Sequence, residues 1–146
     1  FGRWGVNYIY GTWSVLTGLE VAGEHMGQEY IQRAVNWLRH VQNDDGGWGE
    51  SNDSYYPPKH WRPYPSTAFQ TAWALLALLA AGEVRSPAVR RGIDYLLKQQ
   101  KLNGLWNDES YTAPGFPRVF YLKYHGYSNY FPLWALARYR NLLNQS

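Results

Sequence analysis

Two stretches of the chain carry apolar side chains at the spacing of an amphipathic helix. From residue 29 to 42 the apolar stripe consists of Ile31, Ala34, Val35, Leu38 and Val41. A matching stripe follows Ser86-Pro87 and consists of Val89, Ile93, Leu96 and Leu97. Serine followed by proline is typical of a helix start, with an N-cap and then a proline at the first helical position. We therefore expect two helices that each bury one face.

Another segment is apolar on nearly every side. Residues 68–81 contain few polar side chains, which predicts a helix buried on all faces. The preceding Pro65-Ser66-Thr67 predicts its start, and Gly82 predicts its end. A further buried helix is expected from about residue 132 to 143. No stretch of useful length alternates apolar and polar residues, so no strand is predicted.

The chain also repeats itself. Similar segments begin at Arg33 and Arg91, and each continues through an aromatic residue and leucine to Gln, Gly and Trp. The equivalent positions, 58 residues apart, are Gln42 and Gln100, Gly46 and Gly104, and Trp48 and Trp106. A second series places Trp13, Trp73 and Trp134 in similar apolar surroundings, for which we expect core packing. Because amphipathic helices alternate with buried ones, the repeat predicts an all-α fold of hairpins in an inner and an outer layer.

Composition narrows the range of functions. The chain has 146 residues, a net charge of +3 and 45% hydrophobic residues, which is typical of a folded domain. The absence of cysteine excludes disulfides, Cys-ligated zinc, iron–sulfur clusters and a thiol nucleophile. The four histidines show no metal-ligand spacing, and the scattered basic residues predict no nucleic-acid partner. The longest apolar run, residues 72–81, is too short to cross a bilayer. Aromatic residues make up 18% of the chain, and this high fraction is the most unusual feature of its composition.

The repeated pattern resembles the QW repeat of the triterpene cyclases. It reads Arg-(Ala/Gly)-x-x-aromatic-Leu-x-x-x-Gln-x-x-x-Gly-x-Trp at residues 33–48 and 91–106. The opening residues 1–12 and the closing residues 115–127 are similar to segments of the squalene–hopene cyclases, so the resemblance covers essentially the whole chain. It implies that residues 1–146 are the C-terminal part of a terpene cyclase α/α-barrel domain. The expected fold is an incomplete α/α toroid of inner and outer helix hairpins.

The resemblance also implies an activity. Members of this family start the cyclisation of squalene by protonating it, and they form hopene with hopanol as a side product, an isomerase activity with a hydro-lyase side activity. The reaction passes through carbocations in an aromatic-lined cavity without a metal or cofactor, so no cofactor is expected. The expected partners are squalene, the remainder of a parent chain and a membrane surface. A peripheral location on the bacterial cytoplasmic membrane follows from the same resemblance, which also allows a homodimer.

The acid motif of the family is missing from this sequence. That motif is Asp-x-Asp-Asp, and neither Asp44-Asp45 nor Asp108-Glu109 fits it. Both pairs follow a repeat glutamine, where turn and capping roles are expected. We therefore expect the acid in an upstream part of a longer protein and no activity from this chain alone.

The resemblance assigns roles to particular side chains. Substrate-binding rings, which stabilise cationic intermediates, are expected at Trp4, Phe116, Phe120, Tyr124 and Tyr127. Tyr10 is expected to support the hydrogen-bond network of the acid. Structural roles at the ends of outer helices are expected for Gln42, Trp48, Gln100 and Trp106.

Several other functions fit parts of the pattern. A glycoside-processing α/α barrel needs two carboxylates in one cleft, and the carboxylates here lie mostly on outer helices or turns. A protein prenyltransferase β-subunit binds zinc partly through cysteine, which this chain lacks. Another class II polyprene or triterpene cyclase, or a non-catalytic α/α-toroid scaffold, remains as the alternative.

Overall fold

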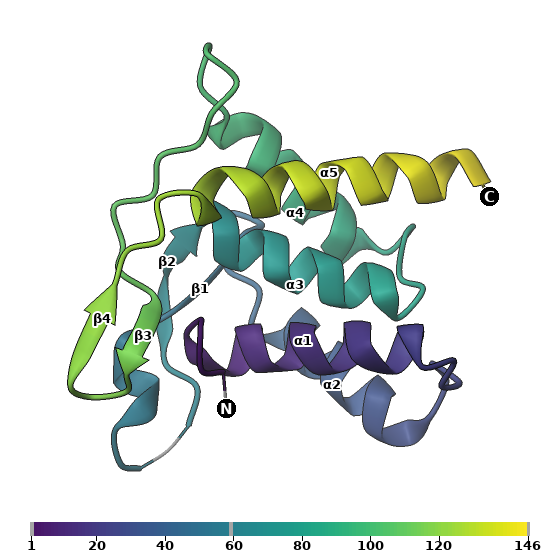
Figure 1. The fold of residues 1–146 in the computed structure, drawn as a ribbon. Coiled ribbons are helices and arrows are strands. Elements are labelled where there is room, and N and C mark those ends of the chain that lie inside the picture. The colour runs from purple at the N-terminus through teal and green to yellow at the C-terminus, as the bar shows by residue number, and fades with distance from the viewer. Residues whose placement is uncertain (1, 59, 146) are drawn as a thin grey trace.

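The computed structural model describes residues 2–58 and 60–145. Helices dominate this part of the chain (Figure 1), and they are α1 (Asn7–Val21), α2 (Glu29–His40), α3 (Ala68–Ala80), α4 (Pro87–Gln99) and α5 (Tyr127–Gln145). The connections contain the strands β1 (Trp48–Glu50), β2 (Pro63–Thr67), β3 (Ala113–Phe116) and β4 (Phe120–Leu122), and the short 3₁₀ helix η1 (Asn52–Tyr55).

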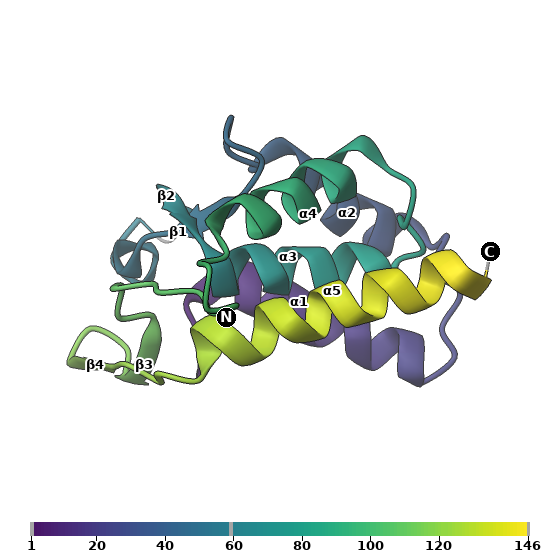
Figure 2. The same cartoon turned by 90° about the horizontal axis from the view of Figure 1, so that it is seen from above.

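The helices form two layers, as Figure 2 shows from above. The inner layer contains α1, α3 and α5, with α3 packed between the other two, and the outer layer contains α2 and α4. The three inner helices run in the same direction, and the two outer helices run back between them (Figure 1). This arrangement confirms the predicted all-α class and is that of an α/α toroid fragment.

Helix α3 is the centre of the core. All 13 of its residues are buried, as its all-round apolar sequence predicts. At its start, the Thr67 hydroxyl accepts a hydrogen bond from the Gln70 backbone amide over 3.2 Å. At its end, Gly82 adopts a positive φ of 82°, and its amide donates to the Leu79 carbonyl. Only glycine takes this conformation without strain, which explains why the helix ends here.

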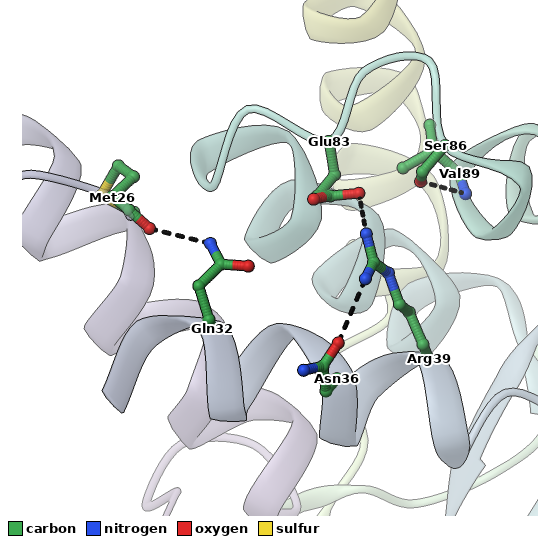
Figure 3. A network of polar contacts seen from close by, with 7 residues as sticks. All are labelled: Met26, Gln32, Asn36, Arg39, Glu83, Ser86 and Val89. Carbon is green, nitrogen blue, oxygen red and sulfur yellow. Dashed lines mark hydrogen bonds and ion pairs between the residues drawn. The ribbon is translucent and has the colours of Figure 1, made fainter. Parts of the chain in front are cut away.

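The outer helices bury one face each, as expected from their stripes, except that Leu97 of the second stripe is 54% exposed. The Ser86 hydroxyl accepts a hydrogen bond from the Val89 amide at the start of α4. Arg39, on the polar face of α2, donates to Asn36 and to Glu83, which follows α3 (Figure 3). This ion pair connects the outer layer to the end of the central inner helix.

The C-terminal helix differs from its prediction. Helix α5 begins at Tyr127, earlier than the expected start near residue 132, and it contains Pro132. A turn sets the earlier start, because the Tyr127 amide donates to Tyr124 and the Tyr130 amide donates to Gly126. The expected burial of this helix is wrong, because within 132–143 its buried residues are Pro132 and Ala135. The expectation of core packing for Trp134 is wrong in part. Its side chain is 45% exposed because α5 lies at an open edge of the inner layer, whereas Trp73 on the central helix is fully buried.

The sequence pattern also missed two small sheets. Strand β1 pairs with β2, and β3 pairs with β4, both antiparallel. Each pairing has a register irregularity, β1, β2 and β3 contain Pro or Gly, and β4 has three residues, so no alternation of apolar and polar residues marks them. The four strands lie at the end of the molecule where the inner helices begin (Figure 1).

The two repeat motifs make the same local contacts. The Trp48 indole donates to the Leu38 carbonyl, and the Trp106 indole donates to the Leu96 carbonyl, both over 2.8 Å. Each tryptophan side chain is therefore hydrogen-bonded to the last turns of the outer helix that precedes it. Both side chains are buried.

The glutamines of the two motifs differ in their longer-range contacts. Gln42 donates to Gly46 within its own turn and to the Ala88 carbonyl of α4, and its oxygen accepts from Arg91. Gln100 donates to Gly104 in the equivalent turn. The first motif thus joins the two outer helices directly.

A glycine allows the outer layer to approach the first motif. A methyl group at Gly92 of α4 would lie 2.7 Å from the Trp48 ring and 2.8 Å from a Leu75 methyl carbon. These distances are shorter than ordinary van der Waals contact, so the absence of a side chain at Gly92 is required for this packing.

We expect Gln42→Ala to lower the free energy of unfolding by about 1–2 kcal/mol, because it removes the hydrogen bonds between the outer helices. Gln100→Ala is the matched control and should cost less than about 1 kcal/mol, since only a bond within the turn is lost. Urea denaturation followed by circular dichroism measures both. Equal losses for the two variants would contradict the assignment of Gln42 as the link.

We expect Gly92→Ala to lower the free energy of unfolding by about 1–2 kcal/mol, although alanine is the better helix former. The reason is the overpacking against Trp48 and Leu75. The control is Gly18→Ala on α1, where a methyl group meets no atom within 4 Å. That change should stabilise the chain by up to about 1 kcal/mol. Thermal melts of both variants measure the change in stability, which should have opposite signs for the two. Stabilisation by both substitutions would disprove the close packing.

Candidate functional site

Aromatic rings gather where the three inner helices begin. The centroid of the Trp73 ring lies 4.9 Å from that of Tyr10, 5.2 Å from that of Phe69 and 5.8 Å from that of Tyr127. These three contacts are edge-to-face, the geometry that aromatic pairs prefer. The cluster continues through Trp13, Phe131 and Trp134. One continuous aromatic network therefore connects α1, α3 and α5.

Three of the predicted substrate-binding residues meet at the edge of this cluster. The Tyr127 hydroxyl donates to the Trp4 carbonyl over 3.2 Å. The Tyr124 and Tyr127 rings lie 4.9 Å apart. The Trp4 side chain, which precedes α1, is 57% exposed. These residues come from opposite ends of the sequence, and they place accessible ring surface beside the starts of α1 and α5.

The other two predicted residues lie on the β3–β4 hairpin. Phe116 and Phe120 are paired across the two strands, with ring centroids 6.0 Å apart. Both side chains are exposed, by 59% and 47%. Two hydroxyl contacts connect the hairpin to the region of η1, from Tyr56 to the Arg118 carbonyl and from Tyr121 to the Asn52 carbonyl. The hairpin therefore presents two phenyl rings outside the helix layers.

Tyr10 lies in the first turns of α1 and is half-buried. Its ring contacts Trp13 as well as Trp73. Burial raises the pKa of Tyr10 above its ordinary value. Burial, together with the neighbouring Tyr10 and Tyr124, raises the pKa of Tyr127 to about 12. Both phenols are therefore neutral hydrogen-bonding groups at physiological pH.

A buried carboxylate that the sequence reasoning missed lies at the start of α1. Glu50 is almost completely buried, and its carboxylate accepts hydrogen bonds from the backbone amides of Asn7, Tyr8 and Ile9. Its own backbone is held by Gln70, which accepts from the Glu50 amide and donates to the Glu50 carbonyl. Glu50 therefore satisfies the free amides of a helix that begins more than 40 residues earlier.

Asp108 does the same for α3. Its carboxylate accepts from the amides of Ala68 and Phe69 over 2.9 and 3.3 Å. Of the expected turn and capping roles, Asp108 therefore has the capping one, but the helix that it caps lies 39 and 40 residues away in sequence rather than next to the turn. Asp45 does have a local role and accepts from the Gly47 amide.

The repeat contained the signal for both carboxylates. Glu50 and Asp108 each stand two residues after a motif tryptophan, and they are 58 residues apart, like the other equivalent positions. Burial raises the pKa of Glu50 and of Asp108, while the amides that donate to them oppose this rise. Lys123 also opposes it at Asp108.

The described residues offer ring faces and neutral hydroxyls rather than a metal centre. Within residues 2–58 and 60–145, no three His, Asp or Glu side chains lie close enough together to hold a metal ion. Among the helices described, none has the length and apolarity needed to cross a bilayer. Exposed aromatic faces attract positive charge through the ring quadrupole. The site is therefore suited to an apolar ligand that carries or develops positive charge.

Comparison with known proteins identifies the family. The family model described as "Squalene-hopene cyclase C-terminal domain" matches residues 1–141. The chain is 62% identical over 145 residues to the squalene–hopene cyclase of Bradyrhizobium diazoefficiens, which covers 99% of this chain and 22% of that protein. It is 61% identical over 143 residues to the squalene–hopene cyclase of Zymomonas mobilis, covering 97% of this chain and 22% of the relative.

A plant relative carries a different name. The dammaradiene synthase of Dryopteris crassirhizoma is 44% identical over 160 residues, covering 100% of this chain and 23% of that protein. The chain thus spans between a fifth and a quarter of the length of these three curated relatives. The family match extends over almost every residue of the chain, including both repeat motifs and both flanking segments. The chain belongs to the squalene–hopene cyclase family and corresponds to its C-terminal domain.

Proposed function

We propose that this chain is part of an enzyme that cyclises squalene to hopene, with hopanol as a side product. Family membership supports the proposal, as do the relatives named squalene–hopene cyclase. The observation that carries it is the group of accessible rings beside the starts of the inner helices. A cyclisation through carbocations needs such ring faces in an apolar surrounding.

In this proposal, Trp4, Phe116, Phe120, Tyr124 and Tyr127 contact the polyene. A ring over a desolvated cation contributes about 2 kcal/mol, and an exposed one about 0.5–1 kcal/mol. Since about 1.4 kcal/mol is a factor of ten in rate, a few rings have a large effect on the reaction. Their positions are fixed before the reaction begins, which is electrostatic preorganisation.

We further propose that the acid that protonates squalene lies outside this chain. No Asp-x-Asp-Asp sequence occurs in the 146 residues. Tyr10 would support the hydrogen-bond network of that acid from the first turns of α1, as a neutral phenol whose pKa is raised by burial. The chain alone is then inactive, and the remainder of the parent chain is its first partner.

The proposal includes peripheral attachment to the bacterial cytoplasmic membrane. Squalene is a hydrocarbon, so it partitions into the apolar interior of the bilayer, and an enzyme that collects it there works at the membrane surface. A homodimer is part of the same proposal by family resemblance. No metal or cofactor has a role in the proposed reaction.

A second candidate is a cyclase that forms another triterpene. The relative named dammaradiene synthase supports it, because this relative covers the whole chain at 44% identity. The same rings would serve both reactions, so the identity of the product separates the two candidates. A non-catalytic scaffold would form no product.

The first test is a chimaera in which this chain replaces the matching segment of the Zymomonas mobilis squalene–hopene cyclase. We expect it to form pentacyclic product from squalene, as read by gas chromatography with mass detection. The isolated 146-residue chain is the parallel sample and should form none. A tetracyclic product would favour the second candidate, and no cyclised product from any polyprene would favour the scaffold.

The second test removes one ring. In the chimaera, Phe120→Leu keeps the apolar volume but loses the ring face, and we expect kcat/KM for squalene to fall about tenfold or more. Phe120→Tyr restores a ring and should recover most of the activity. Tyr30→Leu, on the outer helix α2, is the control and should leave kcat/KM unchanged. An active Phe120→Leu variant would remove Phe120 from the proposed site.

A further inference from the structure

The starts of the inner helices create an electrostatic conflict with the proposed reaction. The N-terminus of a helix carries about +0.5 of an elementary charge. Helices α1, α3 and α5 are parallel, so all three of these positive ends lie at the same end of the molecule (Figure 1). Three of the rings proposed to bind the cation lie there too, since Trp4 precedes α1, Tyr124 precedes α5 and Tyr127 begins α5. Uncompensated, the helix ends would repel a carbocation at this position.

We propose that Glu50 and Asp108 are positioning residues that make the electrostatic potential at this end favourable to a carbocation. The inference rests on the proposed cyclase function. The backbone amides that donate to these carboxylates favour their ionised forms. An ionised carboxylate carries a full negative charge, which exceeds the partial positive charge of the helix end that it contacts. Each ionised carboxylate therefore outweighs the charge of the helix end that it contacts and does more than cap the helix.

The surroundings of Glu50 strengthen its effect. The side chain is almost fully buried, so water screens its charge weakly. The neighbouring Asn7 side chain is also completely buried, and within the described part of the chain its Oδ1 atom has no hydrogen-bond partner. This amide oxygen adds a partial negative charge at the start of α1, and no donor in the described residues neutralises it.

Asp108 is placed closer to the proposed rings. It lines a small cavity of about 10 Å³ together with Tyr124, Tyr127 and Ser128. Lys123 lines the same cavity, and its positive charge favours the ionised form of Asp108. The carboxylate thus lies between the starts of α3 and α5, next to two of the five rings.

Capping alone does not require a carboxylate at the start of α3. The start of α3 already has a neutral cap in Thr67, which accepts from Gln70. The outer helix α4 begins with the neutral cap Ser86 and has no acidic residue in its first turn. A buried carboxylate thus distinguishes the starts of α1 and α3 from that of α4, and the acid in the first turn of α2, Glu29, is exposed.

The experiment compares two inhibitors on the chimaera that carries this chain. One is a squalene analogue ending in a trimethylammonium group, and the other is its uncharged tert-butyl counterpart of the same shape. The variants are Glu50→Gln and Asp108→Asn, which keep an acceptor oxygen but remove the charge. Glu50→Asp and Asp108→Glu keep the charge. Glu29→Gln is the matched control, because Glu29 is an exposed acid in the first turn of the outer helix α2, which starts at the opposite end of the molecule.

We expect each charge-removing variant to weaken inhibition by the ammonium analogue about tenfold, with inhibition by the tert-butyl analogue unchanged. The fraction of incompletely cyclised products from squalene should rise in the same variants. The charge-retaining variants and Glu29→Gln should behave like the unaltered chimaera. If Glu50→Gln does not fold, Asp108→Asn carries the comparison, because Thr67 still caps α3.

Other outcomes overturn the inference in distinguishable ways. An equal loss of affinity for both analogues would show that the carboxylates only hold the structure. No change for either analogue would show that their charges do not reach the cation site. In both cases the unaltered chimaera still cyclises squalene, so the proposed function stands. If the unaltered chimaera forms no cyclised product, the proposed function fails and this inference fails with it.

Discussion

The burial of α3 is the constraint on which the rest of the structure depends. A helix that is apolar on every side is stable in water only when other elements surround it. Helices α1 and α5 cover two sides of α3, and α4 and α2 cover a third. The polar groups of α3 that remain, Gln70 and Thr71, bind the strand β1 and complete the cover. The two-layer arrangement follows from this requirement.

The same requirement explains which parts of the fold could be predicted. The stripes of α2 and α4 and the all-round apolarity of α3 are local patterns. They predicted these three helices and the arrangement in two layers. The start of α5 was missed because a turn around Gly126 sets it, upstream of the apolar pattern. The small sheets were missed because their strands have three to five residues and β1, β2 and β3 contain Pro or Gly, which leaves no pattern of side chains.

The candidate site, like the fold, could be predicted only in part. The residues proposed to bind substrate came from family resemblance, and the structure brings Trp4, Tyr124 and Tyr127 together from distant parts of the chain. Glu50 and the helix that Asp108 caps were missed because each carboxylate acts on a helix about 40 residues earlier in the sequence. A carboxylate that follows a turn has an ordinary local explanation, and only the shared offset of 58 residues points beyond it.

The β3–β4 hairpin is built apart from the helix layers. Its strands pair with each other, and the side-chain hydrogen bonds that it makes with the remainder of the described chain involve the η1 region and its neighbour Tyr56. Residues 116 and 120 can therefore change without disturbing the packing around α3. Natural variation or laboratory evolution could alter the shape presented to a ligand here while folding is preserved. Substitutions that change the product would then lie in the hairpin, and the residues needed for folding would lie in the helix layers of the same chain.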